Sequence, residues 1–92
     1  GWRIVGQRIK TPRGEIDLIA RRGRTVAFIE VKWRARAADL AQAIDPWRLR
    51  RVVAASEAVA HRYGSADDTL RIDVVLIAPW RWPRMIENAT IA

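Results

Sequence analysis

Hydrophobic and polar residues alternate in the first third of the chain. Residues 2–9 alternate weakly, residues 15–20 alternate again, and residues 25–33 form an apolar run interrupted only by Glu30 and Lys32. Period-two alternation is typical of strands, and the intervening stretches KTPRG (10–14) and RRGR (21–24) are typical of turns. The pattern predicts a three-stranded antiparallel meander.

The middle segment of this meander divides its side chains between two predicted faces. Glu15, Asp17 and Ile19 fall on one face, and Ile16 falls on the other with residues 18 and 20. Acidic and apolar side chains are therefore expected side by side on one surface of the sheet.

A helical period follows. Asp45 before Pro46 is typical of an N-cap with proline at the first helical position, and Gly64 is a typical stop. The spacing between them predicts an amphipathic helix of about 18 residues. Its apolar side is expected to carry Leu49, Val52, Val53, Ser56, Val59, Ala60 and Tyr63. Residues 37–44 fit either a helical turn or a loop.

The apolar segment 71–78, ended by Pro79, predicts one further strand, and residues 80–92 show no clear pattern. A meander, a helix and a strand predict an α/β fold. In its mixed sheet, the crossover helix returns the last strand beside the meander. The 92 residues suit a single domain. With no cysteine and no apolar run that could span a membrane, we expect a cytoplasmic protein without membrane contact.

Charge is distributed unevenly along the chain. The net charge is +7, and 15 of the 17 basic residues are arginine. Residues 1–36 hold ten basic and three acidic side chains, whereas residues 37–92 hold seven of each. Because arginine binds phosphate oxygens bidentately, this asymmetry favours a polyanionic partner. A general richness in arginine is the alternative interpretation.

The three acids of the basic first third are Glu15, Asp17 and Glu30, on two predicted neighbouring strands. An ionised Glu30 inside an apolar strand needs a compensating cation. Lys32, two residues on, can supply it in a simple salt bridge. Two carboxylates with a substrate phosphate are also what magnesium takes from proteins, and a nearby lysine suits phosphodiester hydrolysis.

Two segments, GEIDLIA (14–20) and FIEVKWR (28–34), resemble the signature of the YraN-like bacterial family. Segments RIDVV (71–75) and IENA (86–89) resemble its later parts. The family is predicted to contain endonucleases of the PD-(D/E)XK superfamily, related in fold to archaeal Holliday-junction resolvases. The resemblance implies a restriction-endonuclease-like core.

By position, the resemblance implies metal ligation by Asp17, Glu30 and the Val31 carbonyl, with Lys32 as the catalytic lysine. Glu15 matches the motif as an additional candidate. Asp73 also matches, with a structural pairing to Arg71 as the alternative. The family usually opens with a helix carrying a glutamate, and this chain starts after that point, so the domain 1–92 is expected to lack this helix.

Four arginines are candidate phosphate-binding residues. Arg34 and Arg36 follow the Glu-x-Lys motif directly, and Arg48 and Arg51 lie near the start of the predicted helix. Arg48, or its neighbour Arg50, stands where relatives carry a lysine. Ordinary solvated positions are the alternative for all of them.

We therefore expect a metal-dependent endonuclease that uses magnesium, or manganese in its place, on DNA, including branched or structured DNA. The alternatives are a non-catalytic DNA-binding module with a nuclease fold and a protein–protein interaction domain. The five tryptophans suggest stacking on unpaired bases, with core or interface positions as the alternative for all but Trp33. Trp80 and Trp82 suggest an exposed apolar patch and hence a homodimer contact.

Overall fold

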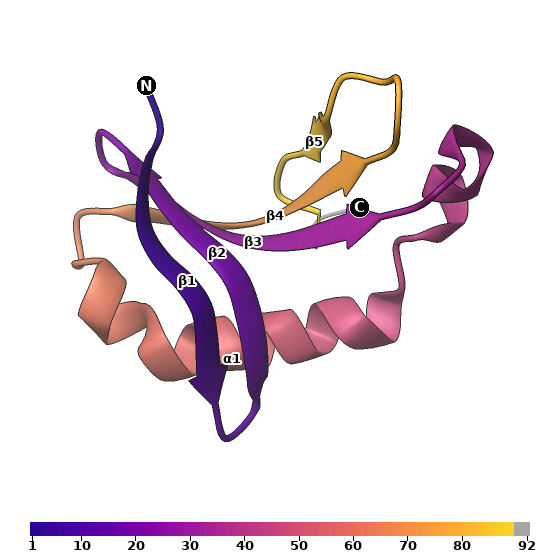
Figure 1. Cartoon of the computed structure of the whole chain (residues 1–92). Helices are drawn as coiled ribbons and strands as arrows, with labels where there is room; N and C mark the ends of the chain where they lie inside the picture. Colours follow the sequence, from indigo (N-terminus) through magenta and orange to yellow (C-terminus); the bar gives the residue numbers. More distant parts are fainter. Residues whose placement is uncertain (90–92) are drawn as a thin grey trace.

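The computed structural model describes residues 1–89, in which a five-stranded sheet carries a long helix along one face (Figure 1). The strands lie side by side in chain order: β1 (Arg3–Thr11), β2 (Gly14–Arg22), β3 (Thr25–Trp33), β4 (Thr69–Ile77) and β5 (Arg84–Ile86). Neighbouring strands are antiparallel except β3 and β4, which are parallel. This architecture confirms the predicted α/β fold with a mixed sheet.

A parallel pair of strands needs a crossover connection. Here it consists of the short 3₁₀ helix η1 (Ala37–Gln42) and helix α1 (Pro46–Tyr63). The Asp45 side chain accepts a hydrogen bond of 2.9 Å from the Trp47 N–H, and the Gly64 N–H donates to the Ala60 carbonyl at the other end. Both predicted helix ends are thus confirmed. Residues 37–44 were expected to form either a helical turn or a loop, and η1 shows that most of them form a helical turn.

The main core lies between α1 and the helix-facing side of the sheet. Every second residue of β3 points toward α1, as the predicted alternation requires. The buried residues of this cluster are Ile16, Ile19, Val26, Phe28, Ala55 and Val59. A second cluster joins the start of α1 to β4 and consists of Ala43, Leu49, Val74 and Leu76.

Ile16 contradicts the predicted division of β2 into two faces. It is fully buried in the same cluster as Ile19, on the α1 side of the sheet. The β1–β2 ladder is irregular beside this residue, since Arg8, between the register partners of Leu18 and Ile16, has a left-handed φ of +48°. The end of the β1–β2 hairpin bends toward α1 (Figure 1).

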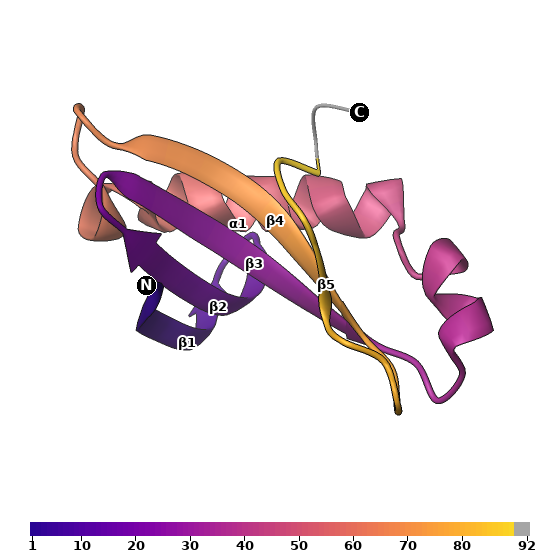
Figure 2. The same ribbon diagram turned by 90° about the horizontal axis from the view of Figure 1, so that it is seen from above.

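The other face of the sheet holds a smaller cluster. Ala20, Ala27 and Ile29 are buried there, with Trp2 packed against them. The Trp2 ring lies 4.6 Å from the Arg22 guanidinium carbon and 5.4 Å from that of Arg71, in cation–π geometry. Figure 2, viewed from above, shows β5 along the edge of β4. The sequence pattern of residues 80–92 did not predict β5.

Candidate functional site

The turn between β1 and β2 brings the hairpin against the first half of α1. Thr11 Oγ1 accepts hydrogen bonds from the N–H groups of Arg13 and Gly14, both at 3.1 Å. Gly14 has φ +151°, and a Cβ placed on it would lie 3.3 Å from the Arg51 carbonyl oxygen. Glycine therefore permits both this backbone conformation and the close approach to α1.

Asp17 lies where β2 and β3 separate. The paired residues of these strands run from Arg22 and Thr25 to Leu18 and Ile29, and Asp17 comes next on β2. Its Oδ2 accepts a hydrogen bond of 2.8 Å from the Val31 N–H, in place of a backbone partner. Since the N–H and C=O of a strand residue point to the same edge, the Val31 carbonyl also faces the gap between the two strands.

Glu30 and Lys32 are both buried, with 6% of each residue exposed. Lys32 Nζ lies 3.0 Å from Glu30 Oε1, and Arg48 Nε on α1 lies 3.5 Å from the same oxygen. The Glu30–Lys32 salt bridge, which the sequence analysis gave as the simple interpretation, is therefore present. The buried Glu30 carboxylate thus faces one buried cation, Lys32, and one exposed cation, Arg48, which together compensate for the cost of removing its charge from water.

A cavity of about 450 Å³ opens between the hairpin, β3 and α1. Most of its lining is charged, and both predicted metal-ligating side chains contribute to it. The lining residues are Gly14, Glu15, Asp17, Glu30, Arg48, Arg51 and Val52. The structure thus brings together, at one opening, three acids from two strands and two arginines from the crossover helix.

The donor set at this cavity suits a hard cation that keeps part of its water shell. Within residues 1–89, no three His, Cys, Asp or Glu side chains come close enough to hold a metal by themselves. Magnesium, however, is commonly bound by one or two carboxylates together with substrate phosphates. Asp17 and Glu30 fit that role, whereas a cage made only of protein ligands does not fit.

The remaining candidate arginines lie elsewhere. Arg34 Nη1 donates to the Trp33 carbonyl at 2.7 Å, and Arg36 Nε lies 3.8 Å from the Asp39 carboxylate. Neither lines the charged cavity. Of the neighbours Arg48 and Arg50, Arg48 reaches Glu30, whereas the Arg50 guanidinium carbon lies 5.5 Å from the centre of the Trp47 ring.

Asp73 lies away from the cavity, on the opposite face of the sheet. It is fully buried and receives two hydrogen bonds from Arg71, at 3.2 and 2.8 Å, and one of 2.9 Å from the Asn88 N–H. The pairing with Arg71 that was the structural alternative is therefore present.

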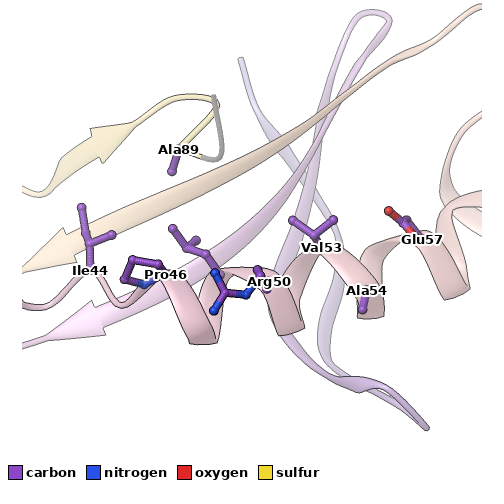
Figure 3. A pocket seen from close by; sticks show the side chains of 8 residues that line it. Ile44, Pro46, Arg50, Val53, Ala54, Glu57 and Ala89 are labelled. Atoms are coloured by element: carbon purple, nitrogen blue, oxygen red, sulfur yellow. The ribbon is translucent and has the colours of Figure 1, made fainter. Parts of the chain in front are cut away.

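A second cavity, of about 560 Å³, runs along the flank of α1, between the helix and the segment that carries Ala89 (Figure 3). Its lining is mainly apolar, and of the residues considered in the sequence analysis as site candidates it contains only Arg50, the alternative to Arg48. The lining residues are Ile44, Pro46, Leu49, Arg50, Val53, Ala54, Glu57 and Ala89. It lacks the convergent polar groups expected of a catalytic centre.

Two residues of the charged cavity were missed by the sequence analysis. Gly14 was interpreted as part of a turn and as the first residue of the motif GEIDLIA (14–20), without a role at the site, and Val52 only as a core residue of the helix. The Thr-Pro-x-Gly turn next to Glu15 was the available signal for Gly14, because the glycine decides how near the acidic end of the hairpin comes to α1. No comparable signal marks Val52.

Among the described residues, no helix is both long and apolar enough to cross a membrane.

A family model described as "Uncharacterised protein family UPF0102" matches residues 1–77. A protein of Sphingopyxis alaskensis is 69% identical over 84 residues, which are 91% of this chain and 72% of that protein. Proteins of Rhizorhabdus wittichii and Erythrobacter litoralis are 64% and 60% identical over 96% and 97% of this chain, and over 75% and 77% of their own lengths. All three are called UPF0102 proteins.

Proposed function

We propose that this chain, which belongs to the uncharacterised protein family UPF0102, is a metal-dependent nuclease domain that hydrolyses DNA phosphodiester bonds. One observation carries the proposal: Asp17 and Glu30, from two strands, line the same cavity as Arg48 and Arg51. Carboxylates that can hold a divalent cation, beside arginines that can hold phosphates, suit metal-assisted phosphodiester hydrolysis.

The residues of the cavity have separable roles in this proposal. Asp17 and Glu30 would hold magnesium, with the Val31 carbonyl on the same edge of β3. When bound, the ion supplies Lewis-acid activation of the attacking water and of the phosphoryl oxygen.

The basic residues act on the substrate. Lys32, 3.0 Å from Glu30, would stabilise negative charge that develops on the phosphate. Arg48 and Arg51 would hold neighbouring phosphates through bidentate hydrogen bonds. Arg48 would then exchange its contact with Glu30 for a contact with DNA.

The Glu30 contacts also support a second candidate function, a DNA-binding module without catalysis. Glu30 already faces two cations, Lys32 and Arg48, so a metal ion competes with both. A site in which these pairs persist on DNA binds phosphates through its arginines and cleaves nothing.

Cleavage of a labelled plasmid and a labelled four-way junction tests the proposal. Wild-type protein should cut in magnesium or manganese and not in chelator. Asp17→Asn and Glu30→Gln should each slow cleavage by about 10²-fold or more while DNA binding persists. Glu57→Gln is the matched control, because Glu57 is an exposed acid at the other cavity.

The two candidate functions give different results. Salt-sensitive binding without cleavage by the wild type, across both DNA forms and both metals, establishes the binding module. Absence of binding as well as cleavage overturns both.

A further inference from the structure

Three tryptophans gather at one end of the sheet. Trp33 ends β3, and Trp80 and Trp82 lie in the loop that joins β4 to β5. Their exposed fractions are 58%, 101% and 92%. Exposed indole rings forgo the stabilisation that burial provides, so a cluster of them marks a contact surface. We call Trp33, Trp80 and Trp82, with Arg81 and Arg84, the tryptophan end.

Backbone contacts hold this end together. Trp33 is the register partner of Ile77 in the parallel β3–β4 pair, and the Arg34 N–H donates to the Ile77 carbonyl at 3.0 Å. The loop that carries Trp80 and Trp82 begins directly after Ile77. The two strands point toward the same end of the sheet in Figure 1, with this loop beyond them.

The tryptophan end is hollowed by a cavity of about 620 Å³ beside η1. Trp82 provides an aromatic wall, Arg81 and Arg84 provide cations, and Leu40 and Leu76 provide an apolar floor. A planar ring beside guanidinium groups matches a nucleobase beside its phosphate.

Charge favours a polyanion over another protein copy. Residues 33–40 and 78–86 carry four arginines and a single acid, Asp39. Within residues 1–89, the ion pairs do not involve Arg81 or Arg84. A two-fold dimer through this surface would place four arginines against the same four, a like-charge juxtaposition that disfavours association.

We propose that the tryptophan end binds unpaired nucleotides of a nucleic acid, with bases stacked on Trp80 and Trp82 and phosphates held by Arg81 and Arg84. The inference rests on the proposed function and adds a substrate class to it: DNA with a single-stranded stretch beside the duplex. Lys32, the ion-pair partner of Glu30, is the register partner of Leu76, which lines the cavity at the tryptophan end, so this cavity and Glu30 lie on the same face of the sheet. An unpaired strand leaving the charged cavity reaches the tryptophan end within a few nucleotides.

Fluorescence anisotropy without divalent metal tests this inference. The probes are a labelled short oligothymidylate and a labelled blunt duplex. The double variant Trp80→Ala/Trp82→Ala should bind oligothymidylate roughly tenfold more weakly or worse, because stacked bases lose their platform, while duplex binding stays unchanged. Trp47→Ala is the matched control, since Trp47 is also exposed, at 63%, but lies on α1. It should leave both affinities unchanged.

Other results overturn the inference. They are an unchanged affinity for oligothymidylate in the double variant, an equal loss with Trp47→Ala, or an equal loss for duplex and single strand. A dimer seen by sedimentation for the wild type and absent in the double variant identifies a subunit contact instead. Because binding is measured without metal, a wild type that never cleaves DNA overturns the nuclease proposal and leaves this comparison intact.

Discussion

The neighbouring strands β3 and β4 each bury an acid with a basic residue two positions away, on opposite faces of the sheet. Asp73 is fully buried, and its hydrogen bonds come from Arg71 and the Asn88 N–H. Glu30 is nearly as buried, but it lines a cavity, and one of its two cationic partners, Arg48, is 62% exposed. The same local pattern therefore produces a closed pair on one face and an open one on the other.

The difference shows that burial of an acid does not by itself identify a site. The hydrogen bonds to Asp73 raise the pKa of the Arg71 guanidinium above its ordinary value, so Arg71 stays charged beside it. Hydrogen bonds from protein groups occupy both oxygens of the Asp73 carboxylate. Glu30, in contrast, has a cavity in front of it and an exposed partner that can leave. What distinguishes a candidate site is access to a charge that the protein only partly satisfies.

The largest expected loss of stability comes from opening the closed pair. Asp73→Ala leaves Arg71, whose side chain is 15% exposed, without its main partner, and leaves the Asn88 N–H without its acceptor. We expect the free energy of unfolding to fall by about 3–5 kcal/mol. Urea denaturation followed by circular dichroism measures it.

Glu87→Ala is the control for that variant. Glu87 lies 3.6 Å from the same Arg71 but is 61% exposed, so its removal should cost less than about 1 kcal/mol. Equal losses for the two variants would show that Asp73 is no more important to the fold than a surface acid, and the comparison would fail.

The open pair should tolerate replacement that the closed pair does not. Glu30→Gln alone should lower the free energy of unfolding by about 1–3 kcal/mol, because Lys32 loses its charged acceptor. The double variant Glu30→Gln/Lys32→Met should return to within about 1 kcal/mol of the wild type, because a buried ion pair can often be replaced by apolar groups. Denaturation of the two variants side by side measures the recovery.

A double variant at the other face supplies the contrast. Asp73→Ala/Arg71→Met should not recover, because the Asn88 N–H still lacks its acceptor. If Glu30→Gln/Lys32→Met is as unstable as Asp73→Ala, the Glu30 pair is a structural element. The charged cavity then loses its main argument for function.

Sequence patterns predicted most of the fold because the signals there are local. The β3 limits, the Asp45 cap and the helix end at Gly64 all depend on neighbouring residues. β5 was not predicted, since its three residues are held by pairing with β4 rather than by any pattern of their own. Ile16 was predicted on the wrong face because period-two alternation assumes a regular strand, whereas the hairpin backbone is irregular at Arg8, on the neighbouring strand.

The candidate site also has a part that local sequence signals could predict and a part that they could not. Spacing along two adjacent strands was enough to suggest that Asp17 and Glu30 converge. The position of Arg48, rather than Arg50, at Glu30 depends on how α1 rotates over the sheet, and the separation of Asp73 from the site depends on which face β4 presents. Neither can be obtained from residue order without the packing of the elements.

The smallest expected effect concerns the exposed partner of the open pair. Arg48→Gln should change the free energy of unfolding by less than about 0.5 kcal/mol, because its contact with Glu30 is long, the Arg48 side chain is 62% exposed, and Lys32 still pairs with Glu30. DNA binding should weaken, and the slope of log affinity against log salt concentration should fall by about one, since one phosphate contact is lost. Arg62→Gln, an exposed arginine in the last turn of the same helix, should leave that slope unchanged. Equal slope changes for the Arg48 and Arg62 variants would mean that DNA affinity depends only on the total charge of the helix. The cavity beside Glu30 would then have no particular role in DNA binding.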